Sequence, residues 1–172
     1  MEKRDLRVVG VDPGLKITGY GIVEGSGGAF SLVEAGIVST RERDEMADRL
    51  RCIYDDVLAL FEEAKPEVAA IEKLYAHYKH PRTAILMGHA RGAILLAAAK
   101  CGIPVASYSA TMIKRSLTGN GHATKRQVQQ MIEVMLGLGQ VPEPPDVADA
   151  LAAALCHLNT AGRPPAIAGR RK

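Results

Sequence analysis

The chain has 172 residues, of which 47% are hydrophobic, with five Tyr, two Phe and no Trp. This length suits one domain around a single aliphatic core. No apolar stretch reaches the ~18 residues that a membrane span needs, and the N-terminus MEKRDLRVVG lacks the apolar segment of a secretory signal. Cys52, Cys101 and Cys156 are far apart and show no metal-type spacing, which indicates free thiols in a reducing compartment. We therefore expect a cytoplasmic protein with no membrane association.

The formal net charge is only +3, but the charges are unevenly distributed. From Lys73 to Ile132 the sequence contains nine Lys or Arg and no Asp or Glu, whereas the rest of the chain carries 13 basic and 19 acidic residues. A charge run is often only a solvated face, yet solubility alone would mix the two signs. This acid-free run therefore favours a surface for a polyanion, most simply nucleic acid.

The first elements are three strands in an antiparallel meander. Residues 7–12 (RVVGVD) read as a buried strand, and residues 18–24 and about 30–39 follow as two more, joined by the turn GSGG. The apolar residues of 44–64 recur every three or four positions, which predicts an amphipathic helix with acids on its outer face. Residues 68–72 (VAAIE) form a further short apolar strand that ends in an acid.

An Ala- and Leu-rich segment over about 83–100 predicts the second helix. The remaining elements are one strand and three helices: 103–108, then about 111–117, 124–136 and 146–158. The predicted fold class is α/β, a five-stranded mixed sheet flanked by helices. No repeat or linker divides the chain, so we expect one domain over 1–160, followed by a flexible basic tail over 161–172 that is rich in Pro and Gly.

Two predicted strands end in a carboxylate, Asp12 on the first and Glu72 on the fourth. The intervening helix makes a crossover, which would place these two strands parallel, with their carboxyl ends side by side where α/β sheets bind ligands. Two unpaired carboxylates in that position would repel each other and lose hydration. A divalent cation would remove this penalty.

The last predicted helix adds two more acids. Asp146 and Asp149 are three residues apart and share one face of its first turn. From Ala150 to Leu158 this helix has no formal charge and should be buried, although Asp146 alone also fits an ordinary cap after Pro-Pro. Four carboxylates without His or Cys at zinc spacing favour Mg²⁺ or Mn²⁺. Beside a basic surface, the matching chemistry is two-metal phosphodiester hydrolysis.

Five segments are distinctive when taken in order: VVGVDPGLKITGYGIV, VAAIEKLY, TAILMGHARGAILLAA, SATMIKRSLTGNGHATKRQVQ and DVADALAAALCH. They cover Val8 to about Leu158 and closely resemble the RuvC family of Holliday junction resolvases. The resemblance implies an RNase H-like fold, a homodimer, and Mg²⁺-dependent symmetric nicking of four-way DNA junctions in recombination and repair. It also implies that Mn²⁺ substitutes, that each site holds two ions, and that the RuvA and RuvB branch-migration proteins are partners.

The resemblance also assigns roles to single residues. It implies four catalytic acids that are also the metal ligands: Asp12, Glu72, Asp146 and Asp149. Lys114 and Lys125 match family lysines implicated in phosphate contact and catalysis, and Tyr75 matches an aromatic position that stacks on a base at the crossover. The basic run supplies the other expected DNA contacts: Lys79, Arg82, Arg91, Arg115 and Arg126. The sequence departs from the family at His89, where GQARG is common and GHARG stands here, and in the loop YAHYKHPRT.

Two other function classes stay open at this point. In a non-enzymatic junction-binding protein, the acids would only cap and pack helices. An ATP-dependent kinase of the actin-like class would share the D-P-G turn and the meander, but such proteins usually need a second lobe. The sequence has no G-x-x-x-x-G-K-[ST] phosphate loop, so the segment TGNGHAT predicts instead a turn that places Lys125 near a phosphate. The small residues of 83–100 would permit close approach of a second copy, but core packing explains them equally.

Overall fold

The computed structural model describes residues 5–74 and 81–161, so Tyr75, Lys79 and the expected tail beyond Ala161 lie outside the described residues. Five strands form one sheet in the order β3-β2-β1-β4-β5. Their bounds are β1 Leu6–Asp12, β2 Ile17–Ser26, β3 Ala29–Ser39, β4 Val68–Glu72 and β5 Val105–Tyr108. The first three strands pair antiparallel, whereas β4 runs parallel to β1 and β5 parallel to β4. The predicted mixed sheet is confirmed.

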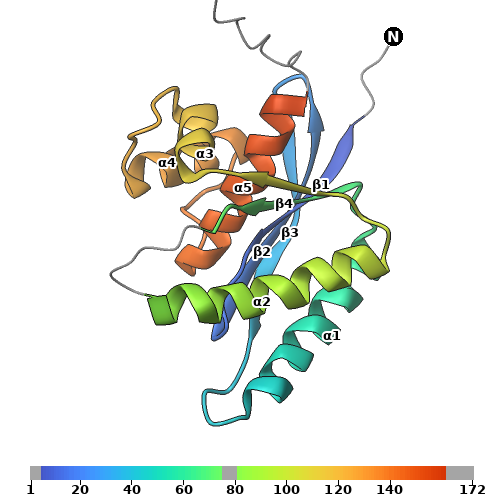
Figure 1. Ribbon diagram of the computed structural model, residues 1–172. Helices are drawn as coiled ribbons and strands as arrows, with labels where there is room; N and C mark the ends of the chain where they lie inside the picture. Colours follow the sequence, from blue (N-terminus) through green and yellow to red (C-terminus); the bar gives the residue numbers. More distant parts are fainter. Residues whose placement is uncertain (1–4, 75–80, 162–172) are drawn as a thin grey trace, which may run out of the picture.

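The helices of the described residues cover both faces of this sheet. Their bounds are α1 Met46–Ala64, α2 Pro81–Lys100, α3 Ala110–Thr118, α4 Lys125–Leu136 and α5 Pro145–Ala161. α1 and α2 pack together on one face, and α3, α4 and α5 lie on the other (Figure 1). Each face therefore has its own apolar core, as expected for a sheet between two helical layers.

β1 is buried on both faces, as its continuous apolar sequence predicts. Val9 and Val11 belong to the core beneath α1 and α2, whereas Val8 belongs to the core beneath α5. Between them, Gly10 allows α5 to approach the strand so closely that a Cβ atom there would lie 1.8 Å from the carbonyl oxygen of Ala150. α5 therefore packs directly on the backbone of the sheet.

The predicted and observed elements differ mainly at their ends. α1 begins at Met46 rather than 44, and α2 begins at Pro81 rather than 83, with proline in the first turn where its missing N–H has no cost. β5 begins at Val105 rather than 103, because Pro104 has no N–H to extend the ladder. α5 continues to Ala161, three residues beyond its predicted end. None of the described helices is long and apolar enough to cross a lipid bilayer.

Candidate active site

The four predicted acids lie at one edge of the sheet. Asp12 and Glu72 are the last residues of the adjacent parallel strands β1 and β4. Side chains alternate along a strand, so both acids project to the same face as Gly10, which is the face covered by α5. Asp146 and Asp149 stand in the first turns of α5, directly above this edge. The structure thus brings together acids from three separate segments.

A second glycine fixes how closely α5 approaches the strand ends. Gly19 on β2 pairs with Asp12 across the sheet. A Cβ atom at Gly19 would lie 2.1 Å from the carbonyl oxygen of Asp146 and 2.9 Å from its Cβ. Only glycine leaves room for the first turn of α5 here, so the sequence of β2 helps to determine where the acids of α5 lie.

The acids affect one another's ionisation. Burial raises the pKa of Asp12 from its ordinary value of 3.8 to about 7, and the charges of Asp149, Asp146 and Glu72 add to the effect. Burial and Asp149 likewise raise the pKa of Glu72. Lys125 opposes both shifts. These half-buried carboxylates therefore form one electrostatic cluster that carries more negative charge than the protein alone neutralises.

The cluster is not a preformed metal cage. Within residues 5–74 and 81–161, no three His, Cys, Asp or Glu side chains already form a group that could hold an ion. One contact separates the acids: Lys125 Nζ lies 2.9 Å from Asp149 Oδ2. The donor set nevertheless fits Mg²⁺ or Mn²⁺, because these ions prefer carboxylate oxygens and would neutralise the cluster. Lys125 holds one of the two carboxylate oxygens of Asp149.

Two lysines lie beside the acids. Lys114 on α3 and Lys125 at the start of α4 line a cavity of about 270 Å³ together with Glu72 and Asp149. The hydrogen bond to Asp149 raises the pKa of Lys125, which keeps its ammonium charged at neutral pH. The cavity is therefore lined by both carboxylates and ammonium groups, which lie in contact at Lys125 and Asp149.

The segment TGNGHAT between α3 and α4 determines the position of Lys125. Gly119 ends α3 in the left-handed conformation, with φ of 78°. Thr124 begins α4 and forms a capping box with Gln127, in which each side chain bonds the other residue's backbone. The segment is thus a tight connection that starts α4 with Lys125 in its first turn, facing α5.

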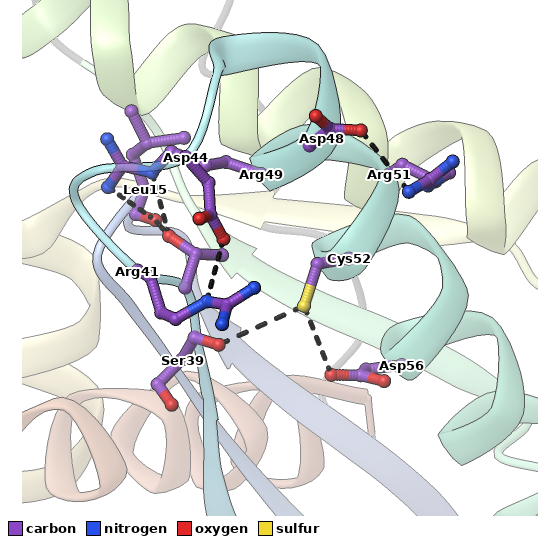
Figure 2. Close-up of polar contacts among 10 residues, drawn as sticks. Leu15, Ser39, Arg41, Asp44, Asp48, Arg49, Arg51, Cys52 and Asp56 are labelled. Atoms are coloured by element: carbon purple, nitrogen blue, oxygen red, sulfur yellow. Dashed lines mark hydrogen bonds and ion pairs between the residues drawn. The ribbon is translucent and has the colours of Figure 1, made fainter.

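Hydrogen bonds from residues distant in the sequence hold the turn after Asp12 at Leu15 (Figure 2). Arg49 on α1 donates to the carbonyl oxygen of Leu15 at 3.2 Å and to Thr40 Oγ1 at 2.9 Å. Thr40 Oγ1 in turn donates to the same carbonyl oxygen at 2.5 Å. Arg49 and Thr40 were not predicted from the sequence, because neither belongs to a motif. The sequence gives only an indirect indication of such residues: the carbonyl groups of a buried D-P-G-L turn need hydrogen-bond donors from other parts of the chain.

The remaining predicted DNA contacts differ in exposure. Arg115 on α3, Arg126 on α4 and Arg82 at the start of α2 are exposed. Arg91 on α2 is only partly exposed, and its guanidinium donates to the backbone of Glu72 and to a β5 side chain. Its hydrogen bonds are thus directed into the protein. Tyr75 and Lys79 were also predicted and lie outside the described residues.

Comparison with known proteins identifies the family. Residues 8–157 match the family model described as crossover junction endodeoxyribonuclease RuvC. The chain belongs to the RuvC family. RuvC of Rhodopirellula baltica is 46% identical over 157 residues, which cover 91% of this chain and 88% of that protein. RuvC of Pelotomaculum thermopropionicum is 45% identical over 87% of this chain and 91% of its own length. The resemblance inferred from the five segments is confirmed.

Solved RuvC structures agree with this fold. A Thermus thermophilus RuvC, described as in complex with a Holliday junction substrate, is 36% identical, with a TM-score of 0.87 over 91% of this chain and 94% of that chain. The yeast mitochondrial Holliday junction resolvase Ydc2 shares only the fold, at 14% identity and a TM-score of 0.61 over 90% of this chain and 79% of that chain. The predicted RNase H-like fold is confirmed. RuvC membership also argues against the actin-like kinase considered from the D-P-G turn.

Proposed function

We propose that this protein is a structure-selective endonuclease that resolves four-way (Holliday) DNA junctions by symmetric hydrolysis of phosphodiester bonds in recombination and repair. Membership of the RuvC family and similarity to a RuvC structure described with a Holliday junction substrate support the substrate. The single observation that supports the chemistry is the meeting of four acids and two lysines at the carboxyl edge of the sheet.

The proposed metal ligands are the four acids of the cluster: Asp12, Glu72, Asp146 and Asp149. We propose Mg²⁺ as the ion, with Mn²⁺ as a substitute and two ions per site. When bound, the ions supply Lewis-acid stabilisation of the phosphoryl group and activation of the attacking water. Lys114 and Lys125 line the same cavity as Glu72 and Asp149, where their ammonium groups orient the phosphate and offset negative charge that develops in the transition state.

DNA binding is proposed to extend from this cavity over the acid-free run. Tyr75 is assigned to base stacking at the crossover, and four basic residues to phosphate contacts: Lys79, Arg82, Arg115 and Arg126. Phosphate contacts release counterions, so junction affinity should fall steeply between ~50 and ~200 mM salt. A flat salt response contradicts this surface.

Symmetric nicking needs two active sites related by a twofold axis, so the functional unit is proposed to be a homodimer. α2 offers a candidate face, because Ile85 is 59% exposed and Leu96 is 61% exposed. Exposed apolar side chains of this size on one helix suit a second copy of the chain. The RuvA and RuvB proteins are proposed partners, and the cytoplasm is the proposed compartment.

Cleavage of a synthetic four-way junction tests the function. The wild type should cut in Mg²⁺ and not in EDTA. The variants D12N, E72Q and D149N should lose cleavage but still bind the junction, because phosphate contacts provide most of the positioning. D48N removes an exposed carboxylate on α1 and should cut like the wild type. Normal cutting by an active-site variant contradicts the assignment, and wild-type binding without cutting favours the non-enzymatic alternative.

A further inference from the structure

Arg91 lies on the face of the sheet opposite α5, yet it reaches the backbone of one of the four acids. Its Nη1 donates to the carbonyl oxygen of Glu72 at 3.1 Å, and its Nη2 donates to Ser107 Oγ at 2.9 Å. Ser107 is on β5, and its neighbour Tyr108 pairs with Glu72 across the sheet. One guanidinium therefore joins α2 to the carboxyl ends of both β4 and β5.

The surroundings of Arg91 are unusual for a surface arginine. Burial lowers the pKa of its guanidinium, which indicates a poorly hydrated position. In the part of the chain that the structure describes, no carboxylate forms an ion pair with it. A cation in such a place is held by neutral acceptors alone, which is costly unless their geometry is well fixed.

Arg91 also lies behind the acid cluster. Its side chain lines a cavity of about 90 Å³ together with Asp12, Pro13 and Glu72. The larger cavity that contains the two active-site lysines meets Glu72 from the other side, among residues of α3, α4 and α5. Glu72 therefore stands between Arg91 on the α2 side and the proposed phosphate position on the α5 side.

We propose that Arg91 is a positioning residue for Glu72. β4 ends at Glu72, and in the peptide that follows the N–H of Lys73 still donates to the carbonyl oxygen of Tyr108 at 2.7 Å, while Arg91 donates to the carbonyl oxygen of Glu72. By holding the carbonyl side of this peptide, the guanidinium completes its fixation and so restricts the direction in which the Glu72 side chain leaves the strand. A planar fork is needed to reach a carbonyl and a hydroxyl together, which lysine cannot do. The proposal rests on the proposed function, because it takes Glu72 as a metal ligand.

This role differs from the sequence-based expectation that Arg91 contacts DNA. A phosphate contact and a positioning role predict different losses on substitution. Loss of a phosphate contact weakens junction binding and reduces its salt dependence by about one counterion. Loss of a residue that orients a metal-binding side chain weakens metal binding by about 10–100-fold. It also lowers the cleavage rate of the enzyme–junction complex. Metal binding without DNA separates the two.

The experiment compares R91M, R91K and S107A with the wild type, and R51M serves as the matched control. Arg51 is an exposed arginine on α1, which packs on the face of the sheet opposite α5, and it pairs with Asp48 at 3.2 Å. For each variant, calorimetry measures Mn²⁺ binding without DNA. Single-turnover assays at saturating junction measure the cleavage rate, and junction affinity is measured across a salt series.

For R91M we expect Mn²⁺ affinity and the cleavage rate each to fall about 10-fold or more, with junction affinity within about 2-fold of wild type. R91K should lose less, because an ammonium group can still reach one acceptor. S107A should lose least, because the bond to Glu72 remains. R51M should match the wild type in all three measurements.

Two results overturn the proposal. One is an R91M variant with wild-type Mn²⁺ affinity, whether or not its junction binding loses salt dependence. The other is an equal loss in R91M and R51M. If R91M fails to fold, R91K decides the matter in the same way, since it keeps the cation and must still bind Mn²⁺ more weakly than R51M does. Failure of the proposed function is distinguishable, because then the wild type itself neither binds Mn²⁺ nor cuts.

Discussion

Lys125 and Asp149 form an ion pair, with 2.9 Å between Nζ and Oδ2. Asp149 is also a proposed metal ligand, so lysine and metal compete for the same carboxylate. Any interaction that must be broken on binding reduces the apparent affinity of the ligand. Lys125 therefore has two opposing effects: it stabilises the metal-free acid cluster, and it contributes positive charge beside the proposed phosphate position.

The first prediction follows from this competition. K125M should bind Mn²⁺ without DNA at least as tightly as the wild type, because Asp149 is free to turn to the ion. The same variant should cleave junctions about 10–1,000-fold more slowly, since the transition state loses one cation. Calorimetry and single-turnover kinetics measure the two effects. R126M removes the next charge along α4 and should leave Mn²⁺ affinity unchanged. Weaker Mn²⁺ binding by K125M alone contradicts the competition.

The second prediction concerns the stability of the metal-free protein. The pKa of Asp12 is about 7 in the folded protein and near 3.8 when the chain is unfolded, so the folded state binds the extra proton. The stability that this proton provides is complete below about pH 4 and is lost as the pH rises through about 7. In EDTA, the free energy of unfolding should therefore fall between pH 5 and pH 8 because Asp12 must ionise inside the cluster.

The variant D12N isolates this effect. Its melting temperature in EDTA should exceed that of the wild type by roughly 4–10 °C at pH 8 and by much less at pH 5. Adding Mg²⁺ at pH 8 should raise the melting temperature of the wild type more than that of D12N. D48N, which removes an exposed carboxylate on α1, should show no such widening with pH. If the melting temperatures of D12N and the wild type differ by the same amount at pH 5 and pH 8, then the pKa of Asp12 is not raised in the folded protein.

The meeting of the four acids could be predicted because each acid has a local signal. Asp12 and Glu72 each end an apolar strand, and the rule for parallel crossovers brings those two ends together. Asp146 and Asp149 share a helix turn ahead of a charge-free stretch. The periodicity of α1 was also a strong signal, because this helix buries one continuous apolar face. The ends of the helices and strands were predicted less accurately, because single capping residues and prolines determine them.

The contacts that support the site could not be predicted in this way. Lys125 and Asp149 are 24 residues apart, and Arg49 and Leu15 are 34 apart, so their meeting depends on how packed elements cross. Arg91 was expected on DNA because it belongs to the acid-free run. α2 is apolar almost all round, so its sequence gave no periodic signal that this arginine faces the strand ends rather than solvent.

The third prediction concerns the contact between α5 and the sheet. A methyl group at Gly10 would meet the carbonyl oxygen of Ala150 at 1.8 Å and the amide nitrogen of Ala154 at 2.9 Å. Because both are backbone atoms of α5, the helix must shift as a whole in G10A. We expect the free energy of unfolding to fall by about 3 kcal/mol, measured by urea denaturation. Mn²⁺ affinity should also fall, because the two acids of α5 move with the helix.

G139A is the control for this substitution. Gly139 is exposed, and an added methyl group there meets no atom within 4 Å. Its stability should stay within about 0.5 kcal/mol of the wild type, with unchanged Mn²⁺ affinity. If G10A is as stable as G139A, then α5 does not rest on β1 as closely as the structure shows.

The fourth prediction concerns the turn that follows Asp12. In R49M, the carbonyl oxygen of Leu15 and the hydroxyl of Thr40 each lose a donor, while the aliphatic stem of the side chain remains. Leu15 is buried, and its carbonyl oxygen then keeps only the bond from Thr40 Oγ1. We expect a loss of about 1–2 kcal/mol in the free energy of unfolding, together with several-fold weaker Mn²⁺ binding as the Asp12 backbone loosens.

R51M, two residues further along α1, provides the comparison for R49M. Arg51 is exposed and pairs only at the surface with Asp48, and such pairs contribute little to stability. The loss in R49M should therefore exceed that in R51M by at least about 1 kcal/mol in urea unfolding. T40V should reproduce part of the R49M loss, because it removes the hydroxyl that joins the two groups. Equal stability of the two arginine variants would show that the turn after Asp12 holds its shape without α1.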